Sequence, residues 1–404
     1  MKRSVFLAAP VVLSAIKPAK AATPIKVGIL FPLTGNAAAA GQAAKAAVEV
    51  AIDIAGSPHP ELHGLAGVNT AKVEPVFVDH QGDPSQAQSD ALRLITQDKV
   101  NALYGAYQSS CTFTATAVAE RYGIPFVVGD SVAANITGRG FKWVFRCTPI
   151  APQLADTYMR FVEDMRSIGK QVRSIAIVNE NTDYGTSVGD AIVAAASAHK
   201  IPVAIRIPYS ANATDVSAQV LQLKEKQPDL VIFVSYTADS ILYMKTMKNL
   251  NYLPPMIIGD DSGFSDPSFI PAVGSISQDV MNRSAWSAGK PGSVTYKINE
   301  MYKAKTGRDL DDTSGRNMQG FLVLADACGR AGSSEPAKLQ AALRATDLKP
   351  SQLMMGYRGV KFDSTGQNEL ASTYLIQLQG SQYKQVWPRH GAEAALQWPM
   401  KGWK

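Results

Sequence analysis

The sequence predicts an α/β protein with two lobes, each built on a doubly wound parallel sheet. After residue 24, short apolar runs rich in β-branched residues alternate with amphipathic helical stretches, which is the pattern of parallel α/β sheets. The alternation forms two four-strand blocks of similar rhythm, one before Arg146 and one after Pro149. A chain of 404 residues also exceeds one hydrophobic core of ordinary size, so two cores are expected.

Each expected strand is a short apolar run bounded by turn residues. The strands predicted for the first block are 26–31, 72–78, 102–105 and 125–129. Those predicted for the second block are 174–179, 203–207, 230–235 and 256–259. The helices predicted between them include 37–54, 84–97, 186–199 and 215–226.

The last third of the chain does not follow this alternation of strands and helices. Helical stretches near 313–331 and 336–345 precede strand-like runs at 359–362 and 374–379. A third block that completes both lobes explains this order, because the chain would then cross between the lobes several times. Crossings of this kind act as hinges.

The first residues have the three parts of a secretory signal peptide. Met1-Lys2-Arg3 is basic, residues 4–16 are a short apolar stretch, and Ala19-Lys20-Ala21 fits the small-x-small cleavage rule. We expect residues 1–21 to be removed and the protein to be periplasmic. An uncleaved anchor is the alternative, because Lys17 and Lys20 make the cleavage region basic. No later stretch approaches the roughly 20 apolar residues of a membrane-spanning helix.

Charge and cysteine content exclude several classes of partner. The formal charge falls from +6 to +2 when four basic residues, and no acid, leave with the signal peptide, so neither nucleic acid nor a membrane surface is expected as a partner. Five scattered histidines show no metal-binding spacing, and we expect no metal and no cofactor. Three cysteines are an odd number, so at least one thiol of Cys111, Cys147 and Cys328 is free or paired between molecules.

Polar residues follow the predicted strands at the edge of the sheet where ligands bind. In open parallel sheets the ligand site lies beyond the carboxyl ends of the strands. The first lobe carries Tyr107-Gln108-Ser109-Ser110 and Asp130-Ser131-Val132 at this edge. The second lobe carries residues 181–185, 235–237 and 260–263 there.

The two edges differ in the chemistry that they offer. The turn 105–112 joins a buried strand to a helical run from Phe113, and its hydroxyls and unpaired N–H groups suit a carboxylate. Ordinary helix N-capping is the alternative. The second lobe offers Tyr184, Tyr236 and the pair Asp260-Asp261, which would match an ammonium group at the other end of the ligand. Core packing of the tyrosines and helix capping by the acids are the alternatives.

Several short motifs occur together in one order and spacing. They are Lys26-Val27-Gly28-Ile29-Leu30 with Pro32-Leu33-Thr34-Gly35, Gly105 with Ser109-Ser110, Gly123-Ile124-Pro125, Ile136-Thr137-Gly138-Arg139-Gly140 with Phe145-Arg146, Asp183-Tyr184-Gly185, and Gly259-Asp260-Asp261. With these motifs the chain resembles type I periplasmic binding proteins of the leucine/isoleucine/valine (branched-chain amino-acid) family. The resemblance extends from Ile25 to about Trp387.

The resemblance implies a fold and a way of working. Two lobes joined by three crossover segments would close on a small molecule and then dock to the membrane permease of an ABC importer. We place the first lobe at 24–147 plus 283–358, the second at 148–282 plus 359–390, and a tail at 391–404. A monomer without enzymatic activity is expected.

The resemblance also implies roles for individual residues. Ser109 and Ser110 would hold the ligand carboxylate with help from the loop Asp130-Ser131-Val132, beside Tyr107. Tyr184 and Tyr236 would cover the ligand from the second lobe. Asp261 occupies the position of the acid that binds the α-ammonium group.

Three departures from the family pattern leave the ligand open. Asp130 and Val132 stand where a small residue and a threonine are frequent, Ala40 stands where leucine binders often have an aromatic residue, and Gln108 replaces a cysteine of the usual small disulfide. The ligand could therefore be an amino acid, an aromatic acid or an amide.

Two other functions are alternatives. One is a ligand-binding sensor for aromatic acids or amides. The other is a serine hydrolase, because Gly185-Thr186-Ser187-Val188-Gly189 matches G-x-S-x-G. However, Ser187 falls inside the first helical turn, and His199 lies about three turns (~18 Å) along the same helix, too far to act as its base.

Overall fold

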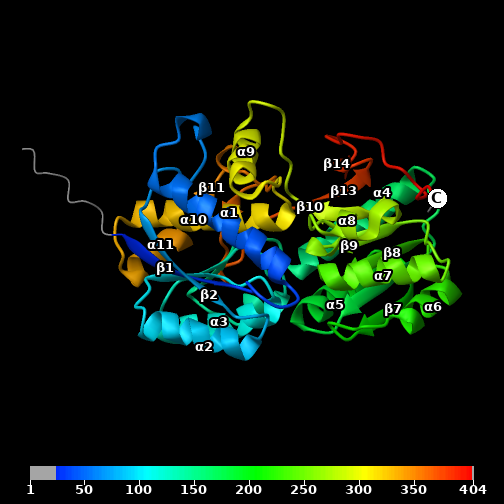
Figure 1. Cartoon of the computed structure of the whole chain (residues 1–404), viewed down its shortest axis with the longest axis horizontal. Helices are drawn as coiled ribbons and strands as arrows, with labels where there is room; N and C mark the ends of the chain where they lie inside the picture. The colour runs from blue at the N-terminus through cyan, green and yellow to red at the C-terminus, as the bar shows by residue number, and fades with distance from the viewer. Residues whose placement is uncertain (1–23, 403–404) are drawn as a thin grey trace, which may run out of the picture.

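The computed structural model describes residues 24–402, which form two lobes side by side (Figure 1). The predicted signal peptide, residues 1–21, lies outside the described residues. The strands of the first lobe's main sheet are β1 (Ile25–Phe31), β2 (Val73–Asp79), β3 (Ala102–Gly105), β4 (Phe126–Val128) and β5 (Val144–Arg146). They pair in the order β2-β1-β3-β4-β5, and every pairing is parallel.

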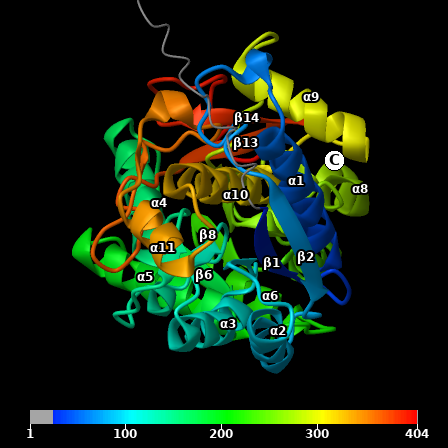
Figure 2. The ribbon, with the colours of Figure 1, turned by 90° about the vertical axis from the view of Figure 1, so that its left-hand side faces the viewer.

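The first sheet separates two apolar cores because alternate side chains of each strand point to opposite faces. Ile29 and Tyr104 face the helices α1 (Ala38–Gly56) and α10 (Asp312–Ala331). Leu30 and Leu103 face α2 (Pro84–Thr96) and α3 (Ser109–Tyr122). Figure 2 shows these two layers of helices above and below the strands.

The second lobe is built on a larger sheet of mixed direction. Its strands are β6 (Ile175–Glu180), β7 (Val203–Tyr209), β8 (Leu230–Val234), β9 (Ile257–Asp260), β10 (Met281–Ser284), β13 (Tyr374–Gln379) and β14 (Gln382–Trp387). They lie in the order β14-β13-β10-β9-β8-β6-β7, with β13 antiparallel to both of its neighbours. The helices of this lobe are α4 (Ala151–Ser167), α5 (Asp183–Ala198), α6 (Ser217–Lys226), α7 (Thr237–Asn249) and α8 (Phe269–Val273).

The chain crosses between the lobes three times, as the resemblance implied. The crossings lie between β5 and α4, between β10 and α9 (Val294–Thr306), and between β12 (Val360–Lys361) and β13. Both α9 and α11 (Pro336–Arg344) add apolar side chains to the core of the first lobe. The predicted α/β fold with two parallel-sheet lobes is confirmed.

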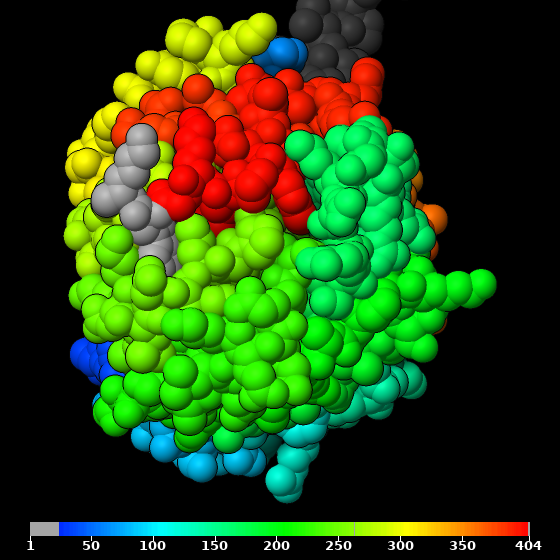
Figure 3. Space-filling view, turned by 90° about the vertical axis from the view of Figure 1, so that its right-hand side faces the viewer, coloured from blue at the N-terminus to red at the C-terminus, as the bar shows by residue number. Residues whose placement is uncertain are grey.

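Two segments pack differently from the predicted lobe boundaries. β12 pairs with β11 (Asp347–Leu348), and Val360 and Phe362 lie in the first lobe's core, whereas residues 359–390 were placed in the second lobe. A two-residue strand has too little pattern to reveal its partner. The predicted tail also packs: Met400 is buried in the second lobe's core, and the red C-terminal segment lies across that lobe in Figure 3.

Candidate functional site

The turn after β3 passes close to β1 and is supported by a buried histidine. Gly105 has φ +138°, and a Cβ there would lie 2.3 Å from Leu30 O, so only glycine fits this turn. His80 Nδ1 accepts the Gly82 N–H at 3.1 Å. Its Nε2–H therefore donates to Ala106 O, 2.9 Å away. Burial lowers the pKa of His80, which keeps the imidazole neutral in this role.

Two hydroxyls fasten the same turn to the loop after β4. Ser131 Oγ donates to Tyr107 O at 2.7 Å and lies 2.6 Å from Thr112 Oγ1. Thr112 Oγ1 also accepts the Ala106 N–H at 3.2 Å. Ser131, predicted as a ligand contact, thus shapes the turn that carries Tyr107.

The first turn of α3 has no side-chain cap. The helix begins at Ser109 rather than near Phe113, so Ser109 and Ser110 lie inside its first turn. The N-cap residue Gln108 makes no side-chain cap bond, and the first intrahelical bond joins Thr112 N–H to Gln108 O. Ordinary capping therefore does not account for the two serines.

In three other helices a nearby carboxylate accepts N–H groups of the first turn, whereas α1 and α11 have no side-chain cap at their N-cap residues. Asp83 accepts two N–H groups of α2, Glu180 accepts the Gly185 N–H of α5 at 2.6 Å, and Asp311 accepts the Ser314 N–H of α10 at 2.7 Å. Among the side chains that the structure describes, none does this for α3. Its first turn carries the partial positive charge of a helix N-terminus.

Three tyrosines lie in contact across the two lobes. The ring of Tyr236, at the N-terminus of α7, lies 5.9 Å from Tyr107 of the first lobe and 5.3 Å from Tyr184 of the second, between ring centroids. Tyr184 donates its hydroxyl to Asp260, with 2.6 Å to the backbone oxygen and 2.9 Å to Oδ2. Burial raises the pKa of Tyr184 well above its usual range, so this hydroxyl stays a donor.

A buried arginine of α10 joins the loop acids of both lobes. Arg316 Nη1 lies 2.7 Å from Asp130 Oδ1 in the first lobe, and Nη2 donates to Asp261 Oδ1 in the second. Its Nε lies 3.0 Å from Asp312 Oδ2, one helical turn earlier. The planar guanidinium group can pair with three acidic side chains at once through its separate N–H groups. An ammonium group does this less well.

A second buried arginine, Arg283 of β10, extends this ion-pair network. Its Nε lies 2.7 Å from Asp260 Oδ1, and Nη1 lies 3.3 Å from Asp312 Oδ2. Asp260 also accepts the hydroxyl of Tyr158. Asp260 therefore faces its own lobe, and Asp261 is the member of the acidic pair that faces the other lobe.

Neither arginine was predicted as a site residue. Arg283 lies in a strand that the sequence pattern did not reveal, and Arg316 lies in the long buried helix α10. One feature of the sequence could have indicated them. Each is a charged residue inside a stretch that is otherwise buried, and a buried charge needs partners.

Burial raises the pKa of the Asp130 carboxyl, and the Arg316 guanidinium opposes that shift. Asp130 is 1% exposed, and Val132 beside it packs into the second lobe's core. The loop after β4 thus reaches from the first lobe to the second. Ser109 Oγ accepts the Ala133 N–H of this loop at 3.3 Å.

Further contacts join the lobes around these residues. Ser187 Oγ of α5 accepts the Ala134 N–H at 2.9 Å, and Asn36 Nδ2 donates to Asn212 Oδ1 at 2.6 Å. The lobes are therefore closed on one another, which explains why the side chains of the candidate site are buried. His199 bonds to Glu163 at 2.8 Å, away from Ser187.

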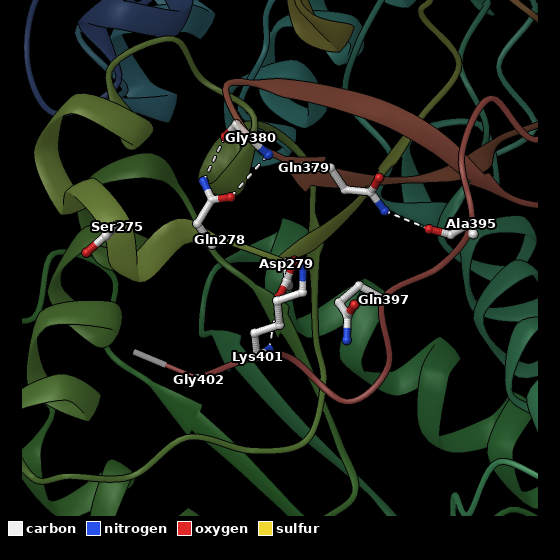
Figure 4. A pocket seen from close by; sticks show the side chains of 9 residues that line it. All are labelled: Ser275, Gln278, Asp279, Gln379, Gly380, Ala395, Gln397, Lys401 and Gly402. Atoms are coloured by element: carbon white, nitrogen blue, oxygen red, sulfur yellow. Dashed lines mark hydrogen bonds between the residues drawn. The ribbon is translucent and has the colours of Figure 1, made fainter. Parts of the chain in front are cut away.

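Three open cavities lie elsewhere on the molecule. One of about 380 Å³ lies on the second lobe beside the C-terminal segment, where Gln278 bonds to Gly380 and Gln379 to Ala395 (Figure 4). One of about 930 Å³ lies between α9 and β14, and one of about 400 Å³ lies on α2 and α3. None of these three is lined by a predicted site residue.

Comparison with known proteins identifies the family. A sequence model described as periplasmic binding protein matches residues 24–382. The chain belongs to this family. A relative named Leu/Ile/Val-binding protein homolog 8, from Brucella abortus (strain 2308), is 31% identical over 386 residues, covering 92% of each chain.

Solved structures agree with the fold of this periplasmic binding protein. A leucine-binding protein, LivK, from Thermotoga maritima MSB8 matches with a TM-score of 0.76 and 21% identity, covering 89% of this chain and 97% of that one. An ABC transporter solute-binding protein from R. palustris in complex with benzoate matches with a TM-score of 0.76 and 18% identity, covering 90% and 96%.

The family predicted from the motifs is thereby confirmed. The family consists of periplasmic substrate-binding proteins rather than enzymes. Within residues 24–402, no helix has both the length and the apolar character that a membrane crossing needs.

Proposed function

We propose that this periplasmic binding protein captures a small carboxylate between its lobes and delivers it to a membrane permease. The observation that carries the proposal is the uncapped first turn of α3, with Ser109 1% exposed beneath the closed second lobe. Its N–H and hydroxyl groups would bind the carboxylate. The rings of Tyr107, Tyr184 and Tyr236 would contact the body of the ligand.

Lobe closure is the proposed mechanism of capture. Only in the closed form do both lobes touch the ligand, so the ligand stabilises that form. Closure also removes water, which strengthens the hydrogen bonds from Ser109 and Ser110 to an anionic group. The relatives support this class of ligand, because one is a leucine-binding protein and another is in complex with benzoate.

Three further points belong to the proposal. Residues 1–21 act as a signal peptide that sends the protein to the periplasm, and the mature protein is a monomer. Ser187 has no catalytic role, because its oxygen accepts an N–H from the other lobe and His199 is bonded elsewhere.

The test is a thermal-shift screen over amino acids, aromatic acids and amides. A ligand that binds only the folded protein raises its melting temperature by mass action. We expect a carboxylate to raise it, and the combined Ser109→Ala and Ser110→Ala variant to bind that carboxylate roughly ten- to a hundredfold more weakly. Ser89→Ala, at an exposed position of α2, is the matched control and should keep the wild-type shift.

Two results would contradict the proposal. A screen in which only neutral amides shift the melting temperature would exclude a carboxylate ligand. Delivery is tested separately, by ATP-dependent uptake of the same solute into vesicles that contain the cognate permease. A solute that binds tightly and is never transported would favour a sensor.

A further inference from the structure

The acid predicted to bind a ligand ammonium group already has cationic partners. Asp261 Oδ1 accepts from Arg316 Nη2, and Arg283 Nη2 lies 3.6 Å from the same oxygen. Thr313 Oγ1 also donates to it at 3.4 Å. The carboxylate is 6% exposed and faces α10 and β10. Two guanidinium groups therefore stand where a ligand cation was expected.

Arg316 is held in this position from three sides. Its Nη1 pairs with Asp130, its Nε pairs with Asp312, and Nη2 also reaches Thr313 Oγ1 at 3.3 Å. The side chain is fully buried, and α10 is buried over most of its length. If a ligand ammonium displaced Arg316 from Asp261, the buried guanidinium would lose one of its three acidic partners.

A cation added beside Arg316 and Arg283 would also be repelled by both. An excess of acids would instead attract a ligand cation, and four buried aspartates do face two arginines. However, two of these acids have partners besides the arginines. Asp312 accepts the Ala285 N–H at 2.7 Å and Asp260 accepts the hydroxyls of Tyr158 and Tyr184, while the raised pKa of Asp130 favours its neutral form.

From this arrangement we propose that Arg316 substitutes for the ligand's ammonium group, so that the site selects carboxylates that lack an α-amino group. This inference rests on the proposed function and names its ligand class. The carboxylate binds at the first turn of α3, and the body that follows is apolar or aromatic because Tyr236 contacts both Tyr107 and Tyr184 there. Arg316 acts as a specificity-determining residue through its pairing with Asp261.

The test compares matched pairs of ligands on the mature protein by isothermal titration calorimetry. One pair is L-phenylalanine and 3-phenylpropanoate, and the other is L-leucine and 4-methylpentanoate. The acid without the amine should bind at least about tenfold more tightly in a pair that fits the site. Arg316→Met removes the nearer of the two guanidinium groups from Asp261 and should shift the ratio of the two affinities at least tenfold toward the amino acid.

A second variant keeps the test valid if Arg316→Met fails to fold. Asp261→Asn should change the affinities of both members of a pair by the same factor, because neither contacts Asp261 directly. A selective loss of amino-acid binding in Asp261→Asn would overturn the inference.

The outcomes separate the inference from the function on which it rests. If the wild-type protein binds the amino acid as tightly as its partner, or more tightly, the inference is wrong and the proposed function stands. If it binds neither a pair member nor any other carboxylate, the proposed function fails and the inference fails with it.

Discussion

Ser187 Oγ in the second lobe accepts the backbone N–H of Ala134 in the first lobe at 2.9 Å. This bond gives the serine of the G-x-S-x-G sequence a structural contact between the closed lobes. We expect Ser187→Ala to weaken ligand binding about two- to tenfold, because the partly buried N–H loses its acceptor in the closed form. Calorimetry with the best ligand of the screen measures this. Ser197→Ala, exposed on the same helix, should bind as the wild type does. Unchanged affinity in Ser187→Ala would show that the bond does not contribute to closure.

Tyr236 links the aromatic side chains of the two lobes. Replacing it by alanine removes ring contacts with both Tyr107 and Tyr184, and each aromatic pair contributes roughly 0.5–1.5 kcal/mol beyond buried area. We expect Tyr236→Ala to weaken ligand binding about tenfold or more, and Tyr236→Phe to retain most of the affinity. If Tyr236→Phe loses as much as Tyr236→Ala, the hydroxyl matters rather than the ring.

His80 should make stability depend on pH. Burial lowers its pKa, so the unfolded chain takes up the proton more readily than the folded one. Its contribution to the free energy of unfolding is therefore complete above the usual histidine pKa of about 6.5 and is lost as the pH falls below it. Urea unfolding at pH 7.5 and pH 5.5 should show a smaller loss on acidification in His80→Gln than in the wild type. His63→Gln, at an exposed position, is the control and should keep the wild-type difference. An identical loss in His80→Gln would contradict this account.

Arg146 should be a main determinant of stability near the first and third crossings. The buried guanidinium donates to Ala133 O and Thr137 Oγ1, both at 2.6 Å, and to Gln367 Oε1 at 2.6 Å. Arg146→Met leaves these acceptors without a donor, and each buried acceptor left unpaired costs about 1–3 kcal/mol. We expect a loss of several kcal/mol in urea unfolding, against a change below about 0.5 kcal/mol for the exposed Arg121→Met. A loss of less than 1 kcal/mol in Arg146→Met would contradict the role of this side chain.

The sequence pattern predicted elements whose apolar runs have clear ends. Residues 102–105 and 374–379 were predicted with the bounds that β3 and β13 have. β14 and β10 were not predicted, because Gln382-Tyr383-Lys384-Gln385 and Met281-Asn282-Arg283-Ser284 contain too many polar residues. β14 pairs with β13, and β10 pairs with both β9 and β13, which lies far away in the sequence.

The candidate site was predictable where it depends on the ends of strands. That rule placed Tyr107, Tyr236 and Asp261 at one edge, and the structure brings Tyr107 and Tyr236 into contact there. The partner of Asp261 was not predictable in this way. Arg316 reaches it from a helix that enters the first lobe only after the second crossing, so the pair depends on how the lobes close. The assignment of ligand-binding roles to these residues stays a prediction.

A crystal structure of the mature protein with its tightest-binding carboxylate tests the central claim most directly. The account predicts closed lobes, with the carboxylate within hydrogen-bond distance of the backbone N–H groups and hydroxyls of Ser109 and Ser110, and Arg316 still paired with Asp261. A ligand carboxylate bound to Arg283 or Arg316 instead, or one bound outside the interface between the lobes, would contradict it.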